Sequence, residues 1–250
     1  MNLLDYTAGI NIARPFFVEF GASTGGTTSP TSPLLESGWR GLWIECDDEK
    51  FDTLNRLYGD NRGLTLLKDK VTPFNIVKIL QGEYKNEQCF TIPQEFGCLC
   101  IDIDGYDYYV LEALLKSFRP AVILCEINEK IPPPIRFSVQ YSDDWKWDKE
   151  HFYGMSLSKL YDLCVGCSYD LVDIEKENAL LIAKEINNGK YQVYIPEDIY
   201  ELKYKNSILA RSPESYNANV SHWLDMDVIE CMDSIKKFFS HSPDKFQIHI

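Results

Sequence analysis

The sequence has few histidines, a shortage of basic residues and no long apolar run. Its 250 residues include 25 Lys and Arg against 38 Asp and Glu, which leaves a formal net charge of −13. Because a surface this acidic repels phosphate backbones, nucleic acid is not the expected partner. No apolar run approaches the roughly 18 residues that a membrane helix requires, so we expect no membrane span.

The N-terminal stretch also lacks the features of a signal peptide. It reads MNLLDYTAGINIARP, with neither a basic start nor a long apolar core. We therefore expect a cytoplasmic protein. The apolar content of 45% is ordinary for a globular chain, and this length suffices for one large domain or for a domain with an appendage.

The eight cysteines lack the paired spacing of a zinc site. Residues 164–167 read CVGC, a CxxC motif, but no second pair at ligand spacing accompanies it. Cys98, Cys100 and Cys125 lie in apolar runs, where cysteine acts as a small hydrophobic residue. We expect reduced cysteines that belong largely to the core.

Short apolar runs alternate with amphipathic stretches along the first half of the chain. The expected strands are residues 15–20, 41–46, 63–68, 97–104 and 120–127. The expected helices are residues 29–38, with a serine cap and a stop at Gly38, then 47–58, 72–84 and 106–118. This alternation predicts a Rossmann-like α/β fold, in which a mostly parallel sheet is covered by helices on both faces.

The pattern changes after the fifth expected strand. Residues 128–154 contain three consecutive prolines and two tryptophans, and we expect a long lid or substrate loop there. A helix capped by Ser156 follows, and residues 169–186 predict an antiparallel hairpin. The tail at 187–250 has a mixed pattern, with a helix expected at 225–239.

A loop of small residues follows the first expected strand, in the stretch FFVEFGASTGG. A dinucleotide fingerprint is missing, because Ser23 stands where the second glycine would let a pyrophosphate approach. The pattern is Glu19-x-Gly21-x-x-x-Gly25, which is compatible with a plain glycine turn. It also suits S-adenosylmethionine, which has cationic groups and no phosphate, and we favour that hypothesis.

An acid also ends the second expected strand. Glu45 is placed to accept hydrogen bonds from ribose hydroxyls, as acids do at this point of nucleotide-binding folds. In parallel sheets, ligands bind beyond the carboxyl ends of the strands. We therefore expect Glu19, Glu45 and the strand-end acid Asp102 to converge on one cleft.

The stretch IDIDGYDYY places two more acids at a strand end. Asp102 and Asp104 alternate and so point the same way, while Asp107 begins the next helix. Two like charges side by side are unfavourable unless a metal, a cation or a shared proton relieves them. Glu126, at the end of the fifth expected strand, would face the same crevice.

Three stretches together resemble the FkbM-like class of S-adenosylmethionine-dependent methyltransferases. They are VEFGASTGGTTSPTSPLLESGWRGLWIECDDEKF, LCIDIDGYDYYVLEAL and VILCEINEKIPP, and the later GMSLSKLYDLCVGCSYDLVDIEKENALLI is similar to that group's last helix and hairpin. The resemblance covers roughly residues 13–186. It implies a seven-stranded sheet, mostly parallel with a C-terminal hairpin, and O-methylation of a sugar, glycan or other small-molecule hydroxyl.

On this basis, residues 1–186 are the expected methyltransferase domain, with 128–154 as its lid, and 187–250 form an extension of unknown role. The candidate cofactor-binding residues are Glu19, Gly21, Ala22, Ser23, Gly25, Glu45, Asp69, Lys70 and Asp102. The resemblance implies that Asp102 lies near the methionine part of the cofactor. It also implies that Asp69 or Lys70 contacts the adenine.

The expected reaction is in-line transfer of a methyl group to an oxygen nucleophile. The candidate catalytic residues are Asp104, His151 and Glu126, and Asp104 or His151 would be the base. Asp102, Asp104 and Glu126 also offer the hard oxygen ligands that Mg²⁺ prefers. Trp145 and Trp147, in the expected lid, could stack on sugar rings or pack the lid down.

Two other functions are compatible with the sequence. One is a nicotinamide-dependent oxidoreductase on a similar sheet, against which Ser23 argues. The other is a non-catalytic binding protein that has kept the fold. The expected partner is a small-molecule or glycan acceptor, and the sequence is compatible with a homo-oligomer.

Overall fold

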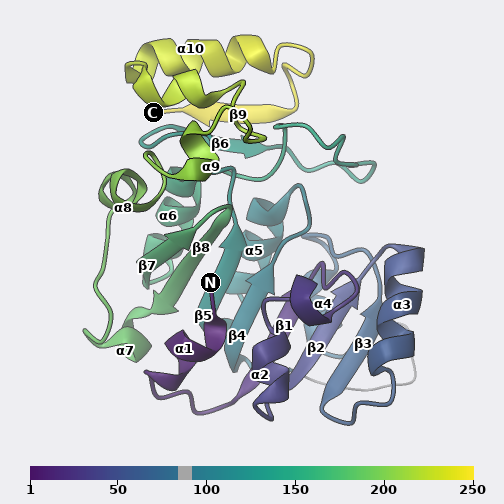
Figure 1. The fold of residues 1–250 in the computed structure, drawn as a ribbon. Helices are drawn as coiled ribbons and strands as arrows, with labels where there is room; N and C mark the ends of the chain where they lie inside the picture. The colour runs from purple at the N-terminus through teal and green to yellow at the C-terminus, as the bar shows by residue number, and fades with distance from the viewer. Residues whose placement is uncertain (84–91) are drawn as a thin grey trace. The chain divides into compact units, whose positions relative to one another are not determined.

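The fold is built on a seven-stranded sheet in the order β3-β2-β1-β4-β5-β8-β7 (Figure 1). It is seen in a computed structural model that describes residues 1–83 and 92–250. The strands are β1 (Phe16–Phe20), β2 (Arg40–Glu45), β3 (Leu64–Lys68), β4 (Glu95–Ile101), β5 (Arg119–Glu126), β7 (Tyr169–Glu175) and β8 (Asn178–Ala183). The sheet is mostly parallel with an antiparallel pair at its edge, which confirms the predicted Rossmann-like fold class.

The remaining elements are helices and a second, two-stranded sheet. The α-helices are α1 (Leu3–Ala8), α2 (Ser32–Glu36), α3 (Asp48–Tyr58), α4 (Ile76–Leu80), α5 (Asp107–Leu115), α6 (Leu157–Gly166), α7 (Lys184–Asn187), α8 (Pro196–Lys203), α9 (Ile208–Arg211) and α10 (Val228–Phe238). The 3₁₀ helices are η1 (Gly26–Thr28) and η2 (Ser221–Asp225), and the second sheet pairs β6 (Arg136–Val139) with β9 (Phe246–His249). Helix α4 is shorter than predicted, and Tyr84, at the end of that prediction, lies outside the described residues.

The chain divides into two compact units. Unit 1 comprises Met1–Ile103, Tyr109–Leu124 and Ile182–Lys190. Unit 2 comprises Asp104–Tyr108, Cys125–Leu181 and Tyr191–Ile250. Most of the C-terminal extension therefore belongs to the same unit as the segment that follows β5.

In unit 1, strand β1 is buried and lies between β2 and β4. Glu19 lies opposite Trp43 on β2 and Cys100 on β4 in a parallel register. Its neighbours Phe17 and Phe20 are fully buried. A strand that is covered on both faces has no solvent side, which explains why four of the five residues in FFVEF are apolar.

Of two helix starts in unit 1, one has a side-chain cap and the other does not. Helix α3 begins after Asp47, whose side chain accepts a hydrogen bond from Lys50 N at 2.9 Å, as a capping acid does. Helix α2 begins after Thr31 and has no side-chain cap, so the predicted serine cap is wrong. The Thr31 hydroxyl instead donates to Glu19 and accepts from Trp43, which leaves it unavailable to cap the helix.

In unit 2, the expected structureless loop at 128–154 contains strand β6 and contributes to a core. Strand β6 pairs antiparallel with β9, so that Phe137 lies opposite Ile248. Residues of this segment and of the extension form one apolar cluster: Ile131, Ile135, Phe137, Val139, Phe152, Val220, Trp223, Cys231, Ile235 and Phe239. Part of the segment therefore belongs to a hydrophobic core, and its exposed residues all lie within 140–150.

No disulfide joins the cysteines that the structure describes. Cys98, Cys100, Cys125 and Cys164 are buried among apolar residues, and Cys89 lies outside the described residues. Among the residues described, none of the helices has both the length and the apolar character needed to cross a bilayer.

Candidate functional site

The loop after β1 lies directly against the ends of the two neighbouring strands. Gly21 N and Ala22 N donate to Ile44 O on β2 at 3.0 and 3.2 Å. Gly21 has a φ of +76°, and a Cβ atom there would lie 1.8 Å from the carbonyl oxygen of Asp102, after β4. Only glycine allows this approach, so Gly21 brings the loop and Asp102 together.

The second half of the loop is fixed by Gly25 and Glu45. Gly25 has a φ of +73°, and a Cβ atom there would lie 2.8 Å from the Tyr58 ring. Ser23 also has a positive φ, of 53°, and its backbone N–H donates to Glu45 Oε2 at 2.8 Å. The serine that replaces a dinucleotide-binding glycine thus presents its backbone to the acid at the end of β2.

Backbone hydrogen bonds hold the side chain of Glu45. Its carboxylate accepts three backbone hydrogen bonds at 2.8 Å, from Ser23 N, Cys46 N and Asp47 N. The residue is only 4% exposed. The loop after β1 and the start of α3 therefore fix the position of one carboxylate.

Asp69 follows β3 and is joined to Glu45 through the backbone, because Asp69 N donates to Glu45 O at 3.2 Å. The Asp69 Oδ2 atom is buried and has no hydrogen-bond partner among residues 1–83 and 92–250. A buried acceptor without a donor is unfavourable, and such atoms often mark a ligand or water position. Lys70, the other adenine candidate, accepts from Asn75 Nδ2 through its carbonyl oxygen at 2.9 Å.

Glu19 has hydroxyl groups as its partners. It is 1% exposed, and its Oε2 accepts from Ser29 Oγ at 2.6 Å and from Thr31 Oγ1. Burial raises the pKa of Glu19 to about 7, although these hydrogen bonds act in the opposite direction. In this structure its carboxylate is engaged inside the protein, where it ties residues 29–31 to β1.

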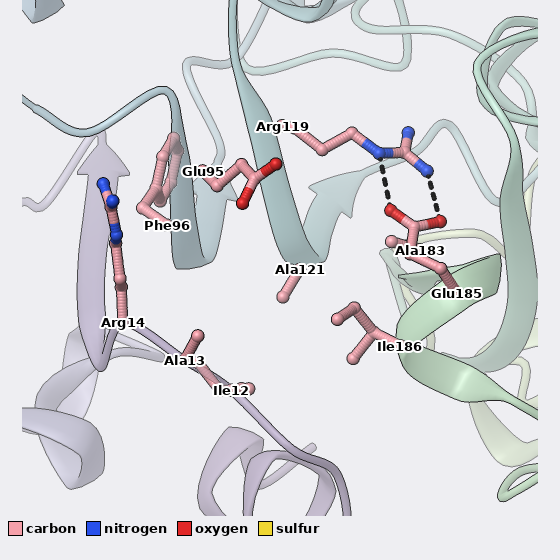
Figure 2. A pocket seen from close by; sticks show the side chains of 10 residues that line it. All are labelled: Ile12, Ala13, Arg14, Glu95, Phe96, Arg119, Ala121, Ala183, Glu185 and Ile186. Atoms are coloured by element: carbon pink, nitrogen blue, oxygen red, sulfur yellow. Dashed lines mark hydrogen bonds and ion pairs between the residues drawn. The ribbon is translucent and has the colours of Figure 1, made fainter.

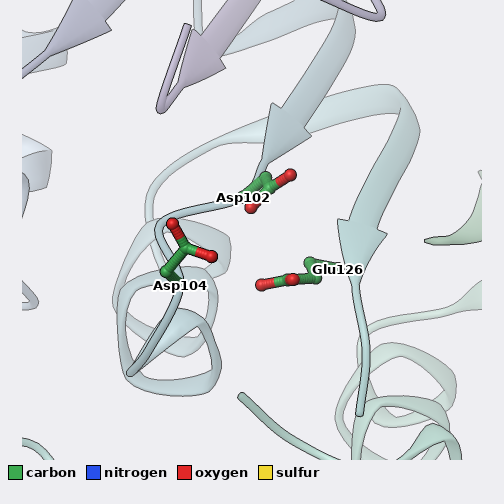
Figure 3. A group of neighbouring side chains, drawn as sticks. All are labelled: Asp102, Asp104 and Glu126. Carbon is green, nitrogen blue, oxygen red and sulfur yellow. The ribbon is translucent and has the colours of Figure 1, made fainter. Parts of the chain in front are cut away.

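Three of the predicted acids lie together at the ends of β4 and β5. Asp102, Asp104 and Glu126 each offer a carboxylate oxygen, and these oxygens all lie within 4.8 Å of one another (Figure 3). Asp102 and Asp104 lie in the turn after β4, and Glu126 is the last residue of β5. This donor set is of the kind that binds a hard divalent cation or orients a hydroxyl group.

The turn that carries Asp104 is held by Trp145. Asp104 has a φ of +54°, and its carbonyl oxygen accepts from Trp145 Nε1 at 2.9 Å. A Cβ atom on Gly105 would lie 2.3 Å from the same Nε1 atom, so Trp145 lies directly on the turn. Gly105 N also donates to Asp107 Oδ2 at 3.0 Å. Packing on this turn is one of the two roles expected for Trp145.

His151 has residues of the C-terminal extension as its partners. It is 2% exposed, its Nε2 lies 2.9 Å from Asn219 Oδ1, and its ring centre lies 4.5 Å from that of Tyr216. Burial, and then the charge of Lys130, lower the pKa of His151. Its Nδ1 atom is buried and finds no hydrogen-bond partner in the described part of the chain. These contacts are typical of a structural histidine.

A buried ionic network in unit 2 was not predicted. Lys130 Nζ lies 3.1 Å from Glu129 Oε2, and the two side chains are 1% and 5% exposed. Tyr153 OH donates to Glu129 Oε2 at 3.1 Å, Asn217 Nδ2 donates to Glu129 Oε1 at 2.7 Å, and Tyr200 OH donates to Glu129 O at 2.6 Å. In sequence, an adjacent Glu-Lys pair before prolines is typical of an exposed turn, and no local signal indicates burial.

No protein family and no curated protein matches the sequence. Solved structures with a similar fold include the glycopeptide N-methyltransferase MtfA complexed with S-adenosyl-L-methionine, at 12% identity and a TM-score of 0.40, covering 71% of this chain and 83% of that one. Another is an S-adenosylmethionine-dependent methyltransferase from Clostridium acetobutylicum, at 10% identity and a TM-score of 0.39. The match covers 72% of this chain and 88% of that one. A third is Aeropyrum pernix fibrillarin with natively bound S-adenosyl-L-methionine, at 12% identity and a TM-score of 0.42. The match covers 67% of this chain and 65% of that one. These values are too low to support any conclusion about activity.

Proposed function

We propose that this chain is an S-adenosylmethionine-dependent methyltransferase of the FkbM-like class, which methylates a hydroxyl group of a sugar, glycan or other small molecule. The observation that carries the proposal is the position of Glu45. Its carboxylate is fixed by the glycine loop of β1 and by the start of α3, at the carboxyl end of a parallel sheet. A ribose is bound by an acid at this point of nucleotide-binding folds.

The residues around Glu45 fit a sulfonium nucleoside better than a nucleotide. Asp69 Oδ2 is a buried acceptor without a donor among the described residues, which suits the amino group of an adenine. Asp102 would lie near the cationic end of the cofactor, and the backbone of the loop after Gly21 would hold its carboxylate. The carboxylates of Glu45, Asp69 and Asp102, at one edge of the sheet, would repel the phosphates of NAD. When bound, S-adenosylmethionine supplies an activated methyl group.

On the acceptor side, Asp104 and Glu126 are the residues that we assign to the hydroxyl group. A carboxylate within hydrogen-bond reach of a hydroxyl orients it and can take its proton. We assign the proton to Asp104, whose turn is fixed by Trp145. If a divalent cation takes part, Asp102, Asp104 and Glu126 would be its ligands.

Calorimetry with S-adenosylmethionine tests the cofactor assignment. We expect binding by the wild-type protein and a loss of about 1–3 kcal/mol in Glu45→Ala, because ribose hydroxyls would lose a buried acceptor. Glu36→Ala, which removes an exposed glutamate, is the matched control and should bind as the wild type does. Equal affinity in Glu45→Ala and the control would contradict the proposal, and binding of NAD in place of S-adenosylmethionine would favour the oxidoreductase.

The hydroxyl acceptor is tested separately. A panel of sugars and other hydroxyl compounds, incubated with radiolabelled S-adenosylmethionine, should yield a labelled product with the wild type and much less with Asp104→Asn. That variant keeps the size of the side chain and removes its basicity. Cofactor binding without labelling of any acceptor would instead indicate a binding protein with the same fold.

A further inference from the structure

A pocket lies in unit 1, at the amino ends of β4 and β5 (Figure 2). Its volume is about 120 Å³, of the same order as the roughly 150 Å³ cavity that admits benzene. It lies well away from the candidate cofactor site, because Glu95 begins β4 and Asp102 follows its end. At about 3.3 Å per residue, the length of β4 puts roughly 20 Å between them.

The lining of the pocket is apolar at its base. Phe96, Ala121 and Ala183 are buried there, and Ile12 and Ile186 are half-buried beside them. An apolar base with a few polar groups around it is the usual composition of a small-molecule site.

One wall of the pocket is fixed against β4. Arg14 lies in the segment before β1, and its carbonyl oxygen accepts from Phe16 N at 2.8 Å. A Cβ atom on Gly97 would lie 2.9 Å from that oxygen, so the backbone of Arg14 is seated directly on β4. The position from which the Arg14 side chain extends is therefore well defined.

The opposite wall carries an ion pair. Arg119 donates to Glu185 through two parallel bonds, Nε to Oε1 at 3.0 Å and Nη2 to Oε2 at 2.8 Å (Figure 2). The hydrogen bond from Arg119 lowers the pKa of Glu185. Each of these two charges is thus already matched within the protein.

Two other charged side chains of the lining are exposed and form no ion pair within the described residues. The Arg14 guanidinium and the Glu95 carboxylate have no ion pair or side-chain hydrogen bond with residues 1–83 and 92–250. Figure 2 shows these two side chains on either side of the Phe96 ring. A positive and a negative group beside an apolar base match a ligand that carries both charges and an apolar side chain.

We propose that this pocket binds a free α-amino acid with an apolar side chain. The carboxylate binds the Arg14 guanidinium, which suits two parallel hydrogen bonds, and the ammonium binds Glu95. The apolar side chain lies on Phe96, Ala121 and Ile186. A simple carboxylic acid would leave Glu95 without a partner, and a simple amine would leave Arg14 without one. The inference is independent of the function proposed above.

Calorimetry on the full chain tests the site with L-leucine as the probe. 4-Methylpentanoate and 3-methylbutylamine are the matched compounds, since each keeps the apolar side chain and lacks one of the two charged groups. We expect leucine to bind, and each matched compound to bind about tenfold or more weakly, because each loses one charge-assisted hydrogen-bonding group. Arg14→Gln and Glu95→Gln should each weaken leucine binding by a similar factor.

The control variants are Arg62→Gln and Glu36→Gln, which remove exposed charges outside the pocket and should leave leucine binding unchanged. Saturating S-adenosylmethionine should also leave it unchanged. Absence of leucine binding, equal binding of 4-methylpentanoate, or full affinity in both pocket variants would overturn the proposal. Displacement of leucine by S-adenosylmethionine would do the same.

Discussion

The two units stabilise their irregular segments in different ways. In unit 1, the strand-end loops are joined mainly by backbone hydrogen bonds, such as those from Gly21 N and Ala22 N to Ile44 O. In unit 2, the segment after β5 is held mainly by buried side chains, with Glu129 and Lys130 at the centre. Both arrangements satisfy buried polar groups.

The difference determines which substitutions each unit tolerates. A loop held by its backbone is indifferent to most side chains but sensitive to any added atom at a close approach. A segment held by charged side chains is sensitive to the loss of either partner, because the other is left buried and unmatched. Glu19 is an exception in unit 1, since it is a buried acid whose carboxylate accepts hydrogen bonds from the hydroxyl groups of Ser29 and Thr31.

The largest effect is expected for Lys130→Met. This change leaves the carboxylate of Glu129 buried without its cation, so we expect the free energy of unfolding to fall by about 3–5 kcal/mol at neutral pH. Urea denaturation measures it. The matched control is Lys116→Met, which removes the cation of the exposed Lys116–Glu112 pair and should change stability by no more than about 0.5 kcal/mol.

The double variant Glu129→Gln, Lys130→Met sharpens this result. Because it removes both charges, it should be less destabilised than Lys130→Met alone. If the single variant lost less than about 1 kcal/mol, the buried pair would not be the main support of unit 2, and the contrast between the units would fail.

The next largest effect is the dependence of the unfolding free energy on pH that arises from Glu19 in unit 1. Its pKa is about 7 in the folded protein against an ordinary value of 4.5, so the folded state binds more protons between these pH values. Stability should therefore fall as the pH rises from 4.5 to 7, by roughly 3 kcal/mol at most, and stay level above that range.

Glu19→Gln isolates this contribution, since glutamine does not titrate. We expect the difference in unfolding free energy between variant and wild type to shift in favour of the variant as the pH rises through this window. Urea denaturation at several pH values measures it, and Glu36→Gln should follow the wild type throughout. A constant difference across the window would show that Glu19 is not a buried, neutralised acid.

The smallest effect is expected for Gly21→Ala relative to Gly38→Ala. Both glycines have positive φ, of +76° and +93°, so both variants share the conformational penalty. Only at Gly21 would the new Cβ atom meet another residue, the carbonyl oxygen of Asp102, whereas nothing lies within 4 Å at Gly38. We expect Gly21→Ala to lose about 1–3 kcal/mol more unfolding free energy than Gly38→Ala does, measured by thermal unfolding. Equal losses would mean that the loop can move away from β4.

The parallel sheet could be predicted because each of its strands carries a local signal. β1 and β5 read as continuous apolar runs, and helix α3 begins at a capping aspartate with acids in its first turn. The acids Glu45 and Asp102 could be placed at strand ends for the same reason. Since parallel strands end at one edge of a sheet, knowing the strand gives the edge.

The partners of the buried polar residues could not be predicted, because they lie far apart in the sequence. The partners of Glu19 are ten and twelve residues away, and Glu129 binds Asn217, 88 residues away. Strand β6 was missed because its pairing partner, β9, lies at the far end of the extension. Periodicity reports which face is apolar, and it says nothing about which distant group meets a buried charge.

The way in which the chain is shared between the two units limits how this protein can be dissected. Each unit contains three separate stretches of chain, and residues 182–190 belong to unit 1 although they lie between two long stretches of unit 2, residues 125–181 and 191–250. No single cut in the gene therefore releases either unit intact. A fragment that stops at residue 186 would lack Asn217, whose amide donates to the buried Glu129 carboxylate, and Tyr200, whose phenol donates to the Glu129 carbonyl oxygen.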